Sequence, residues 1–299
     1  MKEAVDFMAH LAEGFWGCRY ELDDDDFAYV GEGSTPTPDP VGEGTWSHIM
    51  GLADDVAIRT TRFQGRYIER ANAIATTWGE MCGYFTLVDG APRGATQSTL
   101  FLLNEEFEAS LYSCVTGWYR QAFQSLRTAL ELGLAGPYFD IGRPEQLSRW
   151  QAPEGDIGTP SVGQASDVLE TVLAPAFEAA AVSSPFSKKA WVRGQYRYLS
   201  DFSHGRPEAR GGGANSMAGQ NASIWSSNGP VYVPSAVRQW YAAFSATAAA
   251  LAVIAGAAYP VLPRMKGPWD ASTWLDYTRR LLDWSSNRPD WAEPIVARW

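Results

Sequence analysis

The chain has 299 residues, of which 45% are hydrophobic and 19% charged, and its formal net charge is −10. This apolar content excludes an intrinsically disordered chain, and the length suits one large domain. An acidic surface repels nucleic acid as a whole, so any phosphate binding requires a local basic patch.

The first 45 residues predict a short amphipathic helix followed by an irregular linker. Residues 22–45 are rich in Asp, Gly and Pro and have no apolar period. The start lacks the basic residues, long apolar stretch and cleavage site of a secretory signal. Cys18, Cys82 and Cys114 are widely spaced and form no CxxC pair. We therefore expect a cytoplasmic protein with reduced thiols, no metal site and no cofactor.

Apolar residues at steps of three and four predict helices over about 47–88 and 97–135. In the second segment the series is Leu100, Leu103, Phe107, Leu111, Val115, Trp118, Ala122, Leu126 and Ala129. A single helix of this length is about 60 Å long and forms a central strut of the fold. Gly136-Pro137 is expected to end it.

Further helices are predicted over about 160–181, 188–204 and 233–259, and one short helix in the Trp-rich tail 264–299. No convincing alternating strand occurs, so the sequence predicts an all-α bundle of long antiparallel helices. The bundle domain is expected over 46–263, after the N-terminal helix and linker (1–45), and the tail is expected to pack on it. Residues 206–232 predict a long loop.

One apolar segment is long enough to cross a membrane. Residues 240–263 contain no charged side chain. Ten of these residues are Ala, and only five are Leu, Ile or Val. Because small residues let neighbouring helices pack closely, the segment predicts a buried core helix, with a membrane span as the alternative.

The segment 188–204 carries the chemistry-bearing residues. Arg197, Asp201 and His204 are spaced i, i+4 and i+7, so they share one helix face. Histidine suits proton transfer near neutral pH, and arginine stabilises charge on a phosphate. The pattern therefore predicts metal-independent cleavage of an RNA phosphodiester, in which His204 activates the 2′-hydroxyl and Arg197 holds the phosphate.

The surroundings of this face are locally basic. Between residues 187 and 210 six basic residues stand against two acidic ones, Asp201 and Glu208. The basic residues are Lys188, Lys189, Arg193, Arg197, Arg206 and Arg210. Of these, Lys189, Arg193 and Arg206 are the candidate phosphate-binding residues, and the patch is the predicted route to RNA.

A structural interpretation of the same residues remains open. A histidine in the last turn of a helix is favoured by the helix dipole, whatever its chemistry. On 97–135, Arg120, Gln124, Arg127 and Glu131 form a polar stripe that is either a solvated face or the second wall of a polar pocket. If the protein is non-catalytic, Arg127, Glu131 and His204 are expected to form a buried polar network that fixes helix register.

The stretch "RYLSDFSH", with Arg197 and His204 separated by six residues, resembles the R-x(4–6)-H motif of the HEPN superfamily. "SLRTALE" and "YRYLSDFSHGRP", with Tyr196, also resemble a group of bacterial helical proteins with an R-x-x-x-E … Y-x-x-L-S-x-x-x-H pattern. The resemblance implies a ribonuclease of toxin–antitoxin or phage-defence systems, acting as a homodimer, with an antitoxin or other protein as partner.

One residue departs from the motif. Tyr198 stands directly after the arginine, where these nucleases usually carry a small polar residue. Two functions therefore stay open: a ribonuclease or defence effector, with Asp201, Arg127, Glu131 and Tyr196 supporting the catalytic pair, and a non-catalytic helical interaction or sensor protein.

Overall fold

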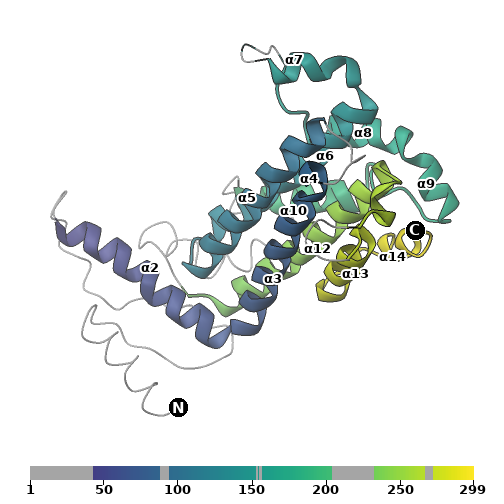
Figure 1. Cartoon of the computed structure of the whole chain (residues 1–299). Helices are drawn as coiled ribbons and strands as arrows, with labels where there is room; N and C mark the ends of the chain where they lie inside the picture. Colours follow the sequence, from purple (N-terminus) through teal and green to yellow (C-terminus); the bar gives the residue numbers. More distant parts are fainter. Residues whose placement is uncertain (1–42, 88–93, 153, 155–156, 204–231, 267–271) are drawn as a thin grey trace.

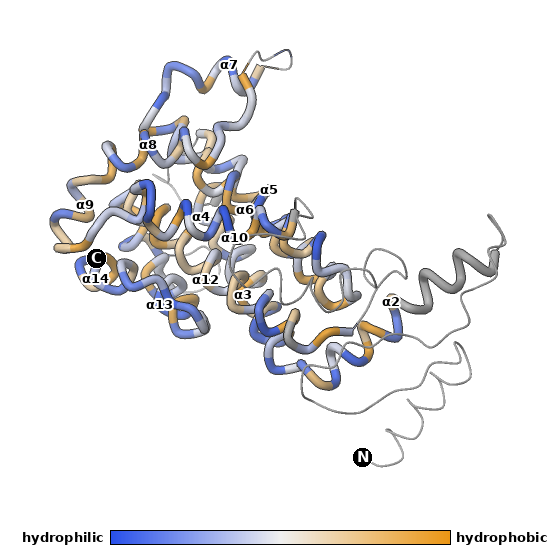
Figure 2. The backbone as a smooth tube through the Cα atoms, turned by 180° about the vertical axis from the view of Figure 1, so that it is seen from behind, coloured by the Kyte–Doolittle hydropathy of each residue, from blue (hydrophilic) through white to orange (hydrophobic). Residues whose placement is uncertain are grey.

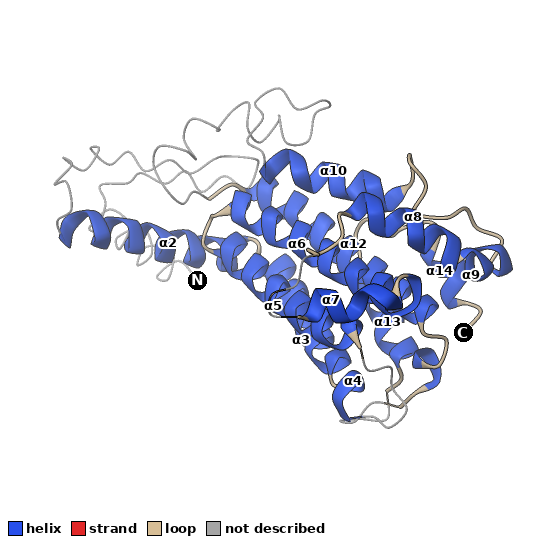
Figure 3. Ribbon diagram, turned by 90° about the horizontal axis from the view of Figure 1, so that it is seen from above, coloured by secondary structure: helices blue, strands red, loops and turns tan. Residues whose placement is uncertain are grey.

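The computed structural model describes residues 43–87, 94–152, 154, 157–203, 232–266 and 272–299, and these form an all-α fold. No β-strand occurs within these ranges, which confirms the predicted fold class. The helices pack into a bundle from which α2 extends away (Figures 1 and 3). The expected N-terminal helix and linker, and the expected loop over 206–232, lie almost entirely outside the described residues.

The described residues form a series of α-helices. They are α2 (Glu43–Phe63), α3 (Gly65–Cys82), α4 (Tyr84–Leu87), α5 (Ala95–Val115), α6 (Tyr119–Pro137), α7 (Leu147–Gln151), α8 (Val162–Val172), α9 (Ala174–Ala179), α10 (Trp191–Ser203), α12 (Pro234–Ala258), α13 (Trp274–Trp284) and α14 (Ala292–Val296). A π-helical turn, η1 (Tyr138–Gly142), follows α6. Hydrophobic and hydrophilic residues alternate every few positions along these helices (Figure 2), as expected when each helix buries one apolar face.

The single long helix predicted over 97–135 is wrong, because the chain turns back on itself at Gly117. This glycine has φ 83°, in the left-handed region, so α5 ends at Val115 and α6 begins at Tyr119. The Trp118 amide donates to the Ser113 carbonyl at 2.7 Å and closes the turn. A Cβ on Gly136, near the end of α6, would touch Thr96 at the start of α5. The strut is therefore an antiparallel helical hairpin.

Other predicted helices are present but subdivided. The segment 47–88 is broken at Gln64 and Gly83 into α2, α3 and α4, and 160–181 is broken at Leu173 into α8 and α9. The predicted helix over 233–259 is confirmed as α12 to within a residue at each end. Apolar periodicity continues across each break, so it located the helical segments without locating the turns between them.

α12 is the central helix of the bundle and packs against α3, α6 and α13 (Figure 3). It is the one described helix that is long and apolar enough to cross a membrane, and 94% of its most apolar window is buried inside the fold. The Trp274 indole donates to the Ala252 carbonyl at 3.1 Å, which places α13 directly on it. Such burial is that of a core helix, as the alanine content predicts.

The π-helical turn holds the start of α5. The Asp140 carboxylate accepts hydrogen bonds from the Ala95 and Thr96 amides at 2.7 and 3.0 Å, so it satisfies amides that the helix leaves unpaired. It also accepts a bond from the Tyr259 hydroxyl at 2.6 Å. Burial, reinforced by the Asp140 charge, raises the pKa of Tyr259. One carboxylate thus ties α5, η1 and the end of α12 together.

Candidate functional site

The predicted site begins on α10, whose apolar face packs against α6. Phe202 stacks on Phe123 with ring centroids 3.7 Å apart, and Tyr198 meets the same ring edge-on. Burial raises the pKa of Tyr198 to about 12. Arg197 is exposed and Asp201 is half-buried. Tyr198 and Phe202 therefore form the packing side of this helix.

Of the predicted catalytic pair, Arg197 is among the described residues. His204 and Arg206 lie outside the described residues, so the expected pairing of His204 with Arg197 stays a prediction. The Arg197 Nε donates to the Arg193 carbonyl one turn earlier, at 3.2 Å. Within the described ranges Arg197 has no acidic partner.

Three of the predicted supporting residues come together where α6 meets α10. Arg127 donates through Nε to Glu131 at 3.2 Å, and through an Nη atom to the Tyr196 hydroxyl at 2.8 Å. Its guanidinium also lies 5.0 Å from the centre of the Tyr196 ring. The Arg127 and Glu131 side chains are 23% and 27% exposed, so the cluster is partly shielded from water. Arg120 and Gln124, on the same predicted stripe, are exposed.

Arg193, a predicted phosphate ligand, instead joins α10 to α8. Its guanidinium donates to the carbonyls of Phe186 and Gly163, at 3.1 and 3.2 Å, and pairs with the Asp167 carboxylate. Because the Arg193 guanidinium already donates to three acceptors, fewer of its N–H groups remain to bind a phosphate. Lys189 is exposed just before α10 begins. No local sequence pattern relates Asp167 to Arg193, because the two residues lie on different helices.

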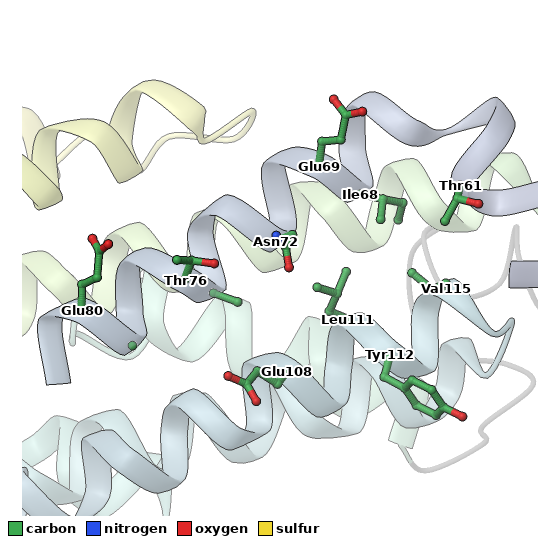
Figure 4. A pocket seen from close by; sticks show the side chains of 12 residues that line it. Thr61, Ile68, Glu69, Asn72, Thr76, Glu80, Glu108, Leu111, Tyr112 and Val115 are labelled. Atoms are coloured by element: carbon green, nitrogen blue, oxygen red, sulfur yellow. The ribbon is translucent and has the colours of Figure 1, made fainter. Parts of the chain in front are cut away.

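A second site lies on other elements. An open groove of about 1050 Å³ lies between α3 and α5, with Thr61 of α2 at one end (Figure 4). Its lining residues are Thr61, Ile68, Glu69, Asn72, Ala75, Thr76, Gly79, Glu80, Glu108, Leu111, Tyr112 and Val115. In the figure Ile68 and Leu111 approach from opposite sides, and the carboxylates of Glu69 and Glu80 project from α3 on the side away from α5. We call this the α3–α5 groove.

α5 leaves apolar side chains exposed to water, and one of them, Tyr112, lines this groove. Phe101, Leu102 and Tyr112 are 42%, 45% and 69% exposed. On the opposite side α5 buries Leu103 and Phe107 in the core. α5 is therefore apolar on more faces than its neighbours in the chain can cover. These additional apolar residues of α5 are visible in the sequence, but they lie outside the apolar series from which the central strut is predicted.

Two of the three cysteines are described, and both are buried free thiols. Burial raises the pKa of Cys82 to about 12, and Cys82 donates to the Leu100 carbonyl at 3.3 Å. Burial also raises the pKa of Cys114. Such thiols are unreactive, because the thiolate is the nucleophilic form. In the part of the chain that the structure describes, no three His, Cys, Asp or Glu side chains converge as metal ligands would.

Comparison of the chain with protein-family models, with curated proteins and with solved structures gives no match. The all-helical fold stands on the structure itself. The resemblance to the HEPN superfamily therefore rests on the Arg197–His204 spacing and the "SLRTALE" and "YRYLSDFSHGRP" segments alone.

Proposed function

We propose that this protein is a non-catalytic helical interaction protein, which binds a protein partner in the α3–α5 groove. The observation that carries the proposal is the exposed apolar surface of α5 beside an open groove, with Tyr112 69% exposed. Exposed apolar surface next to a hollow is characteristic of sites that bind another molecule. The interaction function is the second of the two that the sequence leaves open.

The contacts of the α6–α10 region support a structural role for that region. Arg127 is held by Glu131 and Tyr196, and Arg193 by Asp167 and two carbonyls. These bonds connect α6 to α10 and α10 to α8, which is what fixing the register of packed helices requires. A hydrogen-bonded Arg–carboxylate pair that is partly shielded from water resists displacement by a ligand.

RNA cleavage is the second candidate, and one observation favours it. Arg197 is exposed on α10 without an acidic partner in the described residues, and the exposed Lys188 and Lys189 precede the same helix. A phosphate could reach this basic surface. His204 would then supply the proton transfer, and the homodimer expected from the resemblance would place two such surfaces together.

The interaction proposal is tested by photo-crosslinking in cells that express the full chain. A photoreactive phenylalanine analogue replaces Tyr112, or, as the control, the exposed Gln164 of α8. We expect a discrete adduct from position 112 and none from position 164. The adduct should weaken when Ile68, on the opposite wall, is changed to Asn. No adduct from position 112 would overturn the proposal.

The ribonuclease candidate is tested separately by expressing the wild type, His204→Ala and Arg197→Ala. On the proposed function all three leave cellular RNA intact and growth equal, because neither residue takes part in a reaction. RNA fragmentation by the wild type that both variants abolish would reverse the order of the two candidates.

A further inference from the structure

We infer that the α3–α5 groove takes a cationic amphipathic helix, that is, a partner helix with one apolar stripe flanked by Lys or Arg. This inference rests on the proposed function and names the chemistry of its partner. Three observations support the inference. The walls of the groove are helices, its lining includes three glutamates, and the alternative occupants from this chain are themselves negatively charged.

The walls determine the mode of recognition. Both long walls are α-helices, whose backbone donors and acceptors are used within the helix, so no sheet edge is available to an added strand. Recognition must therefore occur through side chains. Ile68 and Ala75 on α3 face Leu111 and Val115 on α5, which leaves an apolar floor for the stripe of a third helix. From Ile68 to Glu80 the α3 wall is about 18 Å long at 1.5 Å per residue, enough for three turns of a partner helix.

The rim is acidic. Glu69, Glu80 and Glu108 line the groove, and no Lys or Arg is among the described residues that line it. α3 carries two arginines, Arg66 and Arg70, and neither is among the residues that line the groove. Arg66 is 4.6 Å from the centre of the Tyr67 ring, and Arg70 lies close enough to Tyr241 of α12 to oppose the rise of that tyrosine's pKa. Basic residues beside the stripe of a partner helix would complement the three glutamates.

The alternative occupants have the wrong charge. A second copy carries the same net charge of −10, and an isologous contact would set the three glutamates against one another. The chain's own residues 1–26 contain eight acidic residues and two basic ones. Like charges brought together across an interface weaken association. A cationic partner from another chain meets no such repulsion.

The test uses purified full-length protein and two labelled probe peptides of about 18 residues: an amphipathic Leu/Lys helix and its Leu/Glu counterpart. We expect the Leu/Lys peptide to bind and the Leu/Glu peptide not to bind, as measured by fluorescence anisotropy. Affinity for the Leu/Lys peptide should fall on raising the salt concentration, because salt screens the rim charges.

Matched variants separate the groove from the overall negative charge. Glu69→Lys/Glu108→Lys should weaken binding by about tenfold or more, whereas Glu145→Lys/Glu178→Lys, with the same change in net charge elsewhere, should leave it within about twofold. Tyr112→Asp should also weaken binding, and Val261→Asp, at another exposed apolar residue, should not. Equal effects of the two double variants would overturn the inference.

The failure of this inference is distinguishable from failure of the proposed function. If the crosslink from position 112 forms in cells but is unaffected by Glu69→Lys/Glu108→Lys, the groove binds a partner of different chemistry, and only the inference fails. If the crosslink from position 112 does not form at all, the interaction function itself is wrong.

Discussion

Arg193 and Arg197 stand one helical turn apart on α10, in different surroundings. Arg193 donates to the Gly163 carbonyl and Asp167 on α8 and to the Phe186 carbonyl, whereas Arg197 is exposed and, among the described residues, donates to the carbonyl of Arg193. The sequence assigned both to phosphate chemistry because they share residue type and neighbourhood. Partners from another helix decide between a structural and an available cation.

Single polar residues also set the helix ends, and α13 offers a test of this. Thr273 and Asp276 form a capping box, in which each side chain accepts from the other's amide. The hydrogen bonds that the Thr273 amide and hydroxyl donate to the Asp276 carboxylate lower the pKa of Asp276. We expect Thr273→Ala to lower the free energy of unfolding at neutral pH by about 1 kcal/mol. Chemical denaturation of the purified variant and wild type measures it.

The pH dependence of the same cap has a defined sign. Because the pKa of Asp276 is lower in the folded state, its contribution is fully present above the unfolded value of about 3.9 and is lost as pH falls through the folded value. Asp276→Asn should therefore be less stable than wild type at pH 7, and the difference should shrink to nothing in strong acid. A difference that persists unchanged in strong acid would contradict this.

At the scale of elements, the α5–α6 hairpin determines where the candidate sites lie. Folding the chain back at Gly117 puts α6 beside α5, leaving one side of α5 to the α3–α5 groove and one side of α6 to α10. A straight helix would have separated these faces along its length. The turn depends on one residue, because only glycine adopts φ 83° without cost.

Two glycine substitutions with opposite expected effects test this turn. Gly117→Ala should destabilise the fold by about 1 kcal/mol, since alanine is strained in the left-handed region. Gly194→Ala, in α10 with no atom within 4 Å of the added methyl, should stabilise it by about 0.5–1 kcal/mol. Thermal unfolding of both variants measures the difference. A stabilising Gly117→Ala would show that the turn does not need glycine.

At the scale of the whole molecule, α12 is enclosed by the bundle. Its alanines admit close neighbours on several sides, and the window long enough to cross a membrane is 94% buried. A helix covered in this way presents little surface to lipid, and the same apolar residues serve instead as the common core of α3, α6 and α13.

We therefore expect the full chain to remain in the supernatant when cells are lysed and membranes are sedimented. The cytoplasmic location predicted from the sequence is tested by the same experiment. Retention in the membrane pellet after an alkaline wash would show that α12 inserts into lipid. Light scattering of the purified supernatant protein then tests the expected homodimer.

The sequence by itself determined the helical class, the approximate helical segments and the polar face of α10. Each of these depends on residues within a few turns of one another, such as Arg197 and Asp201, and apolar periodicity reports on that range. Tertiary structure decided the rest. Arg127 and Tyr196 are 69 residues apart and Arg193 and Asp167 are 26 apart, so their contacts exist only once helices have packed. The α3–α5 groove likewise requires the chain to turn back at Gly117, because two helices must lie alongside each other before a space can form between them.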